Sequence, residues 1–329
     1  MSGVLAGLPL FTTAYGDVSL SKRPMDRVVH PLRDMGATIS GRKDASLLPL
    51  SFNGTPLNGT KHTLKVRSAQ VKSALILAGL LAEGETTVVE KGQTRNHTEM
   101  LLPQFGIDLD VEGSTITIQG GQKLKACDVK VPGDISSAAF FIVAAALTPD
   151  SSLTIKDVGL NPTRDGIIHV IKRMGGTIET NIHTYVGDEP IGDVHVKTSS
   201  LKGITIEGDM IPNVIDEIPI IALAATQAEG RTIIKDAEEL RYKETDRISA
   251  VVDNLRQLGA NVEAREDGII IHGPTPIAGG TVDSYGDHRI GMMGAVASLI
   301  SESSVTILDK DCINISYPSF FSHLNEVLK

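Results

Sequence analysis

Residues 216–259 read DEIPIIALAATQAEGRTIIKDAEELRYKETDRISAVVDNLRQLG, and this stretch contains one complete folding unit. Its first part, 218–225, is apolar on all sides, which is typical of a buried helix. Residues 232–235 then predict a strand. Residues 248–258 carry apolar side chains at helical spacing and end at Gly259, as a left-handed helix cap requires. The stretch therefore predicts a buried helix, a strand and an amphipathic helix.

The same order of elements returns along the chain. Further copies begin near residues 3, 68, 136 and 287, and the amphipathic helices of the first four copies end at glycines 36, 106, 175 and 259. This spacing is far longer than a solenoid repeat, so it favours a supersecondary unit repeated to build domains. We expect an α/β (α+β) fold with central buried helices and sheets outside them.

A break in the pattern at residues 130–134 (KVPGD) predicts the domain boundary, because Pro and Gly interrupt regular structure there. The predicted domains are 1–131, with about two repeats, and 132–329, with three. The first copy also lacks the start of its leading helix. We therefore expect that an N-terminal unit is missing and that the first domain is incomplete.

Composition narrows the possible functions. The net charge of −9 argues against nucleic-acid binding, although small anions could bind where cations gather. Two cysteines without a recognisable spacing fit a reduced, cytoplasmic setting, and the nine histidines form no metal-binding pattern. The longest apolar run, 138–147, is too short to span a membrane, and residues 1–11 lack the features of a signal peptide.

Residues 239–247 (ELRYKETDR) concentrate charge ahead of the amphipathic helix. Lys243 and Arg247 are four residues apart, so on a helix they would share one face, with Glu244 beside them. Two cations and an acid at a helix N-terminus suit anion binding and proton transfer. The alternative is a solvated first turn with internal ion pairs.

Other helix heads carry similar groups, and in parallel repeats all would face the space between the domains. Arginines 23, 95, 247 and 289 offer bidentate donors to carboxylate or phosphate. Simpler roles remain open: serines 68, 136 and 137 and Asp216 could be helix caps, His288 could be structural, and Lys72 is expected to be surface charge. No phosphate-binding glycine motif supports nucleotide binding.

Together these motifs resemble those of the EPSP synthase (3-phosphoshikimate 1-carboxyvinyltransferase) family. The matching stretches are KRPM (22–25), SAQVKSA (68–74), RNHTE (95–99), PGDISSA (132–138), DEIP (216–219), LRYKETDR (240–247) and DHRI (287–290). The resemblance implies two inside-out α/β-barrel domains of three repeats each, closing on substrate. The family's N-terminal Lys-Ser pair and Asn-x-Gly-Thr-x-x-Arg loop have no counterpart here, and residues 312–318 lack a lysine that many members carry.

The resemblance also implies site residues. Shikimate 3-phosphate would be held by Ser68, Ala69, Gln70, Arg95, Asp216 and Lys243. Phosphoenolpyruvate would be held by Arg23, Gln70, Arg247 and Arg289.

The implied chemistry is addition–elimination through a tetrahedral ketal, in aromatic amino acid biosynthesis by the shikimate pathway. Asp216 would accept or orient the proton of the attacking hydroxyl, Lys243 would help to move it, and Glu244 would protonate the methylene carbon and later remove a proton. No metal or organic cofactor is implied. The expected partners are the two small substrates, without nucleic acid or membrane, for a monomeric chain.

Two rival interpretations remain. The related UDP-N-acetylglucosamine enolpyruvyltransferases usually carry a cysteine before an Arg-Pro, and the loop 15–22 here has none. Alternatively, the chain is a non-catalytic fragment or one part of a split enzyme that needs an N-terminal segment in trans.

Overall fold

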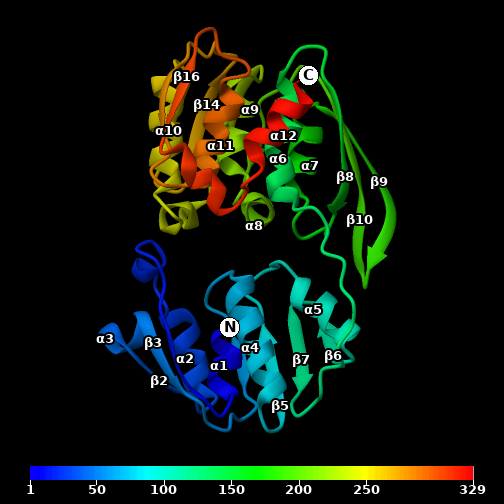
Figure 1. The fold of residues 1–329 in the computed structure, drawn as a ribbon, viewed down its shortest axis with the longest axis vertical. Helices are drawn as coiled ribbons and strands as arrows, with labels where there is room; N and C mark the ends of the chain where they lie inside the picture. Colours follow the sequence, from blue (N-terminus) through cyan, green and yellow to red (C-terminus); the bar gives the residue numbers. More distant parts are fainter. Residues whose placement is uncertain (329) are drawn as a thin grey trace. The chain divides into compact units, whose positions relative to one another are not determined.

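The computed structural model describes residues 1–328, which form two units of mixed helix and sheet (Figure 1). Unit 1 comprises Met1–Lys130 and Gly187–Glu189, and the described part of unit 2 comprises Val131–Val186 and residues 190–328. None of the helices within 1–328 is long and apolar enough to cross a membrane.

Unit 1 contains two sheets. The first is antiparallel throughout, with strand order β1-β3-β2, and the second has order β4-β5-β7-β6, in which β4 and β5 are parallel and the other pairs antiparallel. The strands are β1 (Phe11–Ala14), β2 (Thr38–Gly41), β3 (Leu47–Asn53), β4 (Lys61–Thr63), β5 (Glu85–Val89), β6 (Leu109–Glu112) and β7 (Thr115–Gln119). The helices are α1 (Ser2–Gly7), α2 (Asp26–Asp34), α3 (Arg42–Ala45), α4 (Ala69–Leu81) and α5 (His97–Leu101), with short 3-10 helices η1 (Leu20–Lys22) and η2 (Leu102–Phe105).

The core of unit 1 is built around α4. This helix contacts α1, α2, β5 and β7, and Leu75 and Ile76 on it are fully buried. Its sequence is apolar on nearly every side after the cap at Ser68, so no face of it is suited to water. From the opposing sheet, Val88 and Ile116 are also buried.

Unit 2 contains three sheets, with strand orders β8-β10-β9, β11-β12-β14-β13 and β15-β16. The strands are β8 (Ser152–Gly159), β9 (Thr177–Val186), β10 (Glu189–Lys197), β11 (Thr205–Ile206), β12 (Gly230–Ile234), β13 (Asn261–Ala264), β14 (Ile269–Gly273), β15 (Gly280–Asp283) and β16 (Val305–Leu308). The helices are α6 (Ile135–Leu147), α7 (Gly166–Arg173), α8 (Ile211–Val214), α9 (Ile218–Thr226), α10 (Arg247–Gln257), α11 (His288–Ala297) and α12 (Phe320–Val327), with 3-10 helices η3 (Gly208–Met210), η4 (Glu238–Tyr242) and η5 (Lys310–Ile315).

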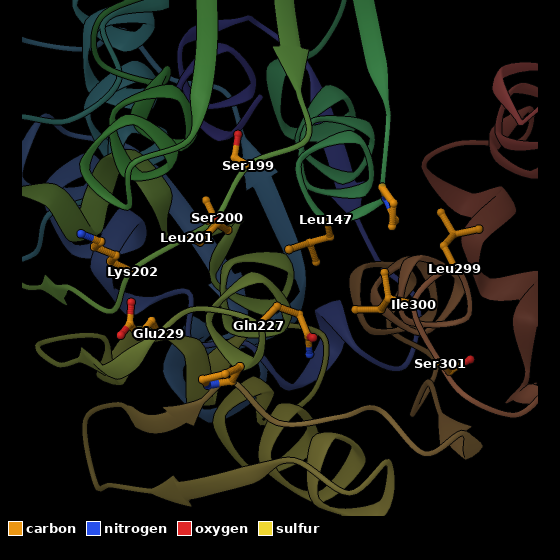
Figure 2. A pocket seen from close by; sticks show the side chains of 12 residues that line it. Leu147, Ser199, Ser200, Leu201, Lys202, Gln227, Glu229, Leu299, Ile300 and Ser301 are labelled. Atoms are coloured by element: carbon orange, nitrogen blue, oxygen red, sulfur yellow. The ribbon is translucent and has the colours of Figure 1, made fainter.

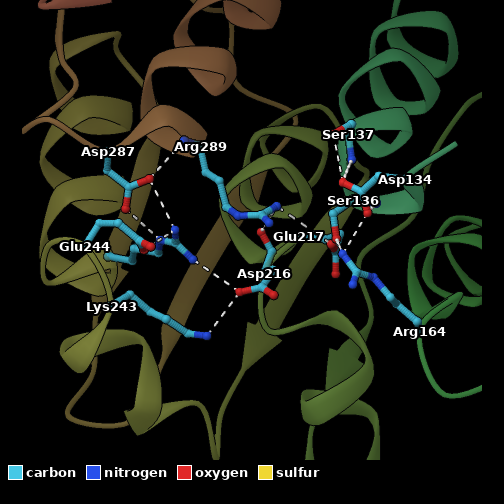
Figure 3. A network of polar contacts seen from close by, with 11 residues as sticks. Asp134, Ser136, Ser137, Arg164, Asp216, Glu217, Lys243, Glu244, Asp287 and Arg289 are labelled. Carbon is cyan, nitrogen blue, oxygen red and sulfur yellow. Dashed lines mark hydrogen bonds and ion pairs between the residues drawn. The ribbon is translucent and has the colours of Figure 1, made fainter. Parts of the chain in front are cut away.

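Three apolar helices, α6, α9 and α11, pack on one another in the core of unit 2. All nine residues of α9 are buried, and α6 and α11 are buried over most of their length. The sequence prediction of helices that are apolar all round is thus confirmed at these positions. Because their N-terminal residues appear together in Figure 3 and their C-terminal ends line one pocket in Figure 2, the three helices run in the same direction.

The predicted recurrence of elements has a clear counterpart in the sheets. The sheet β4-β5-β7-β6 of unit 1 and the sheet β11-β12-β14-β13 of unit 2 share strand order and strand directions. The predicted left-handed caps are also confirmed, since glycines 36, 106, 175 and 259 have φ of 99°, 76°, 87° and 95°. One predicted helix, 95–106, is different: α5 gives way to the 3-10 helix η2, where Pro103 removes a backbone donor.

Candidate active site

Arg247 is the centre of the polar cluster in unit 2 (Figure 3). Its side chain is only 1% exposed and is surrounded by three carboxylates. Nε donates to Asp287 Oδ2 at 2.7 Å, Nη2 to Glu244 Oε2 at 2.6 Å and to Asp287 Oδ1 at 3.3 Å, and Nη1 to Asp216 Oδ1 at 3.4 Å. Four of the five guanidinium N–H groups are therefore directed at carboxylates.

The local sequence explains how these groups meet. Helix α10 begins at Arg247, and Asp246 caps it by accepting from the backbone N–H of Ser249 at 3.2 Å. Lys243 lies before the helix in an extended conformation, at the end of η4. The expectation that Lys243 and Arg247 share a helical face is therefore wrong, because Asp246 stops the helix short of Lys243.

Lys243 and Arg247 nevertheless converge, and they do so on Asp216. Lys243 Nζ donates to Asp216 Oδ1 at 3.1 Å, the same oxygen that Arg247 approaches. Asp216 does not cap α9; the N-cap position is Glu217, whose side chain does not accept from the first backbone N–H groups of the helix. Arg289, in the first turn of α11, donates to the backbone carbonyl of Asp216 at 3.1 Å (Figure 3). The cluster therefore draws on three helix heads and the loops before them: Asp216 precedes α9, Lys243 and Arg247 stand at the start of α10, and Arg289 is in the first turn of α11.

The neighbouring carboxylates keep the buried Arg247 guanidinium charged. Burial works to lower the pKa of the Arg247 guanidinium, but Asp287, Glu244 and Asp216 outweigh it and raise that pKa. Burial, followed by the neighbouring Arg289, lowers the pKa of the His288 imidazole, so this ring is neutral near pH 7. Cations and carboxylates at contact distance can hold an anion and move a proton. Within residues 1–328, no group of three or more potential ligands is arranged for a metal ion.

Asp287 is the residue that sequence reasoning missed in this cluster. It is fully buried, binds Arg247 through both oxygens and caps α11 by accepting from the Arg289 backbone N–H at 2.9 Å. Its position at the head of an apolar helix signalled the cap, but nothing in the sequence indicated its arginine partner.

A second polar group at the head of α6 was also missed. Asp134 caps this helix by accepting from the backbone N–H groups of Ser136 and Ser137, so those serines are not the caps. Arg164 Nη2 donates to Asp134 Oδ1 at 2.7 Å and to Ser136 Oγ at 2.8 Å (Figure 3).

In unit 1, the expected binding residues divide between a pocket and its surroundings. Ala69, Gln70 and Arg95 line a pocket of about 270 Å³, together with His97 and Thr98. The first two stand in the first turn of α4, and Arg95 lies just before α5.

The remaining two expected residues of unit 1 lie outside the lining of this pocket. The Ser68 hydroxyl accepts from the Val71 backbone N–H at 3.3 Å, so it serves as the cap of α4. Arg23 lies between η1 and α2.

Lys72 was predicted to be an exposed surface charge, and this prediction is wrong. It is fully buried in α4, where its ammonium contacts Glu90 Oε1 at 3.1 Å and Glu99 Oε1 at 2.6 Å. The two carboxylates lie outside the helix, so helical periodicity alone could not reveal them.

A second pocket, of about 610 Å³, lies in unit 2, and Figure 2 shows the residues that line it. It is lined by the C-terminal ends of the buried helices, at Leu147, Gln227 and Ile300. A helix of 13 residues such as α6 is about 20 Å long, so this pocket is separated from the helix heads by that length. The predicted site residues do not line it.

Comparison with known proteins identifies the family. Residues 1–324 match the family model of EPSP synthase (3-phosphoshikimate 1-carboxyvinyltransferase). The chain belongs to the EPSP synthase family. Among relatives, the 3-phosphoshikimate 1-carboxyvinyltransferase of Oceanobacillus iheyensis is 57% identical over 329 residues, and that of Bacillus pumilus is 54% identical over 330. Each alignment covers 100% of this chain and 77% of the relative.

Solved structures agree with this assignment. The EPSP synthase of Acinetobacter baumannii matches with a TM-score of 0.88 and 44% identity, over 99% of this chain and 75% of that one. The enolpyruvyl transferase NikO from Streptomyces tendae matches with a TM-score of 0.75 at 18% identity, which supports the fold alone. The EPSP synthase resemblance inferred from the sequence motifs is confirmed.

Proposed function

We propose that this chain transfers the enolpyruvyl group of phosphoenolpyruvate to the 5-hydroxyl of shikimate 3-phosphate, giving 5-enolpyruvylshikimate 3-phosphate and phosphate. The observation that carries the proposal is the Arg247 cluster, in a chain whose relatives bear the name of this activity. Lys243, Arg247 and Arg289 supply positive charge, and Asp216 and Glu244 supply carboxylates next to them.

The proposed reaction has two steps. In the addition, the 5-hydroxyl oxygen bonds to C2 of phosphoenolpyruvate while Glu244 protonates the methylene carbon. Asp216, 3.1 Å from the Lys243 ammonium, accepts or orients the hydroxyl proton. In the elimination, the C–O bond to phosphate breaks and Glu244 takes a proton back from the methyl group. Glu244 ends the cycle in the protonated form in which it began, and the hydroxyl proton leaves with the phosphate, so the proposed reaction needs no further proton donor or redox group.

Binding is assigned to the other predicted residues. Arg23, Gln70, Arg247 and Arg289 are proposed to hold phosphoenolpyruvate. Ser68, Ala69, Gln70, Arg95, Asp216 and Lys243 are proposed to hold shikimate 3-phosphate. Three of the latter set, Ala69, Gln70 and Arg95, already share one pocket.

The finer architecture also belongs to this proposal. Unit 2 would be an inside-out α/β barrel of three repeats carrying the catalytic residues, and unit 1 an incomplete domain that binds shikimate 3-phosphate. The parallel buried helices of unit 2 and the matching four-stranded sheets support this arrangement. We propose a monomeric chain that works in the cytoplasm.

The decisive assay follows phosphate release with both substrates present. Phosphate should appear only when both are added, and mass spectrometry should detect the enolpyruvyl ether. Glu244→Gln should release phosphate far more slowly and serves as the low-activity comparison. UDP-N-acetylglucosamine replaces shikimate 3-phosphate in a parallel reaction; turnover with that acceptor alone would assign the chain to the sister activity.

The second candidate function is that of one part of a split enzyme, which turns over substrate only when an N-terminal segment is supplied in trans. It is favoured by one fact: the chain spans 77% of the length of the relatives it matches. The N-terminal segment of the Oceanobacillus relative, supplied in trans, should then restore turnover that the chain alone lacks. Turnover by the chain alone at the rate of the full-length relative would contradict this candidate.

A further inference from the structure

The buried lysine of unit 1 has no part in the function described so far. Lys72 is 0% exposed, and its partners Glu90 and Glu99 are each 7% exposed. Burying an ammonium ion costs several kcal/mol unless opposite charges compensate it, and such an ion pair is on average no more stabilising than an apolar contact. Stability alone is therefore a poor reason for a lysine at this position in an otherwise apolar helix.

The two carboxylates stand at the two ends of one short segment. Glu90 follows β5 directly, and Glu99 lies in α5, so residues 91–98 form the connection between them. Lys72 on α4 contacts both, at 3.1 Å and 2.6 Å. One side chain thereby ties both ends of the connection to the same helix.

Two further hydrogen bonds hold the connection from within. The Thr94 hydroxyl donates to Glu90 Oε1 at 2.5 Å, on the oxygen that Lys72 also contacts. The hydroxyls of Ser73 and Thr98 are 2.6 Å apart, which links α4 to the far end of the connection. The contacts thus reach the residue immediately before Arg95 and the third residue after it.

Arg95 and the first turn of α4 line the same pocket of about 270 Å³. Gln70 reaches this pocket from α4, whereas Lys72, two residues further along, is buried among its carboxylates. Residues two apart on a helix point to different faces. The same helical turn therefore presents one side chain to the pocket and uses the other to anchor the segment that carries Arg95.

We propose that Lys72, Glu90 and Glu99 are positioning residues, which fix Arg95 relative to the first turn of α4. This inference rests on the proposed function, because it takes the pocket to be the site of shikimate 3-phosphate. The buried ion pairs fix the position and orientation of residues 91–98 on α4, which an apolar side chain, lacking directional contacts, would not do. An arginine held in this way binds a phosphate or a hydroxyl without first losing conformational freedom.

The main test replaces all three charges together, so that no buried charge is left unpaired. In the variant K72M/E90Q/E99Q we expect a native circular dichroism spectrum, a loss of at least 10-fold in affinity for shikimate 3-phosphate by calorimetry, and faster hydrogen exchange at residues 91–98. Exchange in α10 of unit 2 should not change. Lys61→Met, at an exposed lysine of β4, is the matched control and should bind as the parent chain does.

A milder variant keeps the test decisive if the triple variant does not fold. Thr94→Val removes the hydrogen bond to Glu90 without altering charge or size, and should weaken binding about 3- to 10-fold. Folded variants with parental affinity and parental exchange at 91–98 would overturn the positioning role. If the parent chain itself does not bind shikimate 3-phosphate, the proposed function fails, and the anchoring of residues 91–98 is then judged by exchange alone.

Discussion

Replacing Asp287 with Asn tests whether the buried charge on Arg247 depends on this carboxylate. Asn retains an oxygen that can cap α11, so the substitution removes the charge and leaves the cap. The two side chains are 0% and 1% exposed, so solvent screening offers no relief. Breaking a buried ion pair costs about 3–5 kcal/mol, and because Glu244 and Asp216 remain beside Arg247 we expect a loss near the lower end, about 3 kcal/mol.

Urea and thermal unfolding followed by circular dichroism measure this loss. For a unit of this size, about 3 kcal/mol corresponds to a decrease of roughly 6–12 °C in Tm. Hydrogen exchange should place the destabilisation in α10 and α11. Asp246→Asn is the matched control, because Asp246 also caps a helix and pairs with an arginine, Arg241, but at 37% and 29% exposure. An exposed pair of this kind contributes about 1 kcal/mol or less. Equal effects of the two substitutions would refute the reasoning.

Three other outcomes follow from the structure. Glu244→Gln should lower kcat about 100- to 10,000-fold, as measured by phosphate release, without raising the KM for phosphoenolpyruvate, because the carboxylate no longer competes for Arg247. A parental kcat would remove Glu244 from proton transfer. Burial lowers the pKa of His62 despite the opposing effect of Asp34, so the unfolded chain binds a proton at this residue more readily than the folded chain does. The contribution of His62 to the free energy of unfolding should be complete above pH 6.5 and should fall below it by at most about 1.4 kcal/mol per pH unit. Urea titrations of His62→Leu should show a weaker dependence of the free energy of unfolding on pH. Cys127 is exposed, whereas burial raises the pKa of the Cys312 thiol, so a thiol reagent should modify one cysteine in the native chain and both in urea.

The parts of the fold that sequence predicted best are those fixed by local chemistry. Helices α6 and α9 have no polar face, so burial was the only favourable environment for them. The glycines after the amphipathic helices could be placed because a left-handed cap at 259, for example, is strained for other residues. These features need no knowledge of distant partners.

The helix boundary near residues 243–247 shows where such reasoning fails. The spacing of Lys243 and Arg247 is compatible with one continuous helix. In the structure Asp246 is instead the N-cap, where it accepts a hydrogen bond from the Ser249 backbone N–H, and α10 begins at the next residue, Arg247. A cap and an acidic first-turn residue look the same in sequence. Only the backbone conformation distinguishes them: Asp246 is extended, and the preceding 3-10 helix η4 packs against α10.

The burial of Lys72 contradicted its prediction, and the burial of Arg247 was not foreseen, for a related reason. Lys72 and Arg247 occupy polar-looking positions near helix starts, yet both side chains are almost completely buried because carboxylates from other elements surround them. Partners such as Glu99 and Asp287 lie 27 and 40 residues away in the chain. Long-range pairing of this kind leaves no periodic signal.

The carboxylates around Arg247 also bear on how the proposed chemistry would begin. Arg247 already satisfies most of its donors with Asp287, Glu244 and Asp216, so an incoming anion must compete with these groups. Glu244 is the partner best able to yield, because it is 31% exposed whereas Asp216 is 13% exposed and Asp287 is buried. A phosphate or carboxylate arriving at Arg247 would place like charge beside Glu244 and favour its protonated form. Binding of the anionic substrate would thereby create the acid that the addition step needs, while Asp287 keeps Arg247 in place.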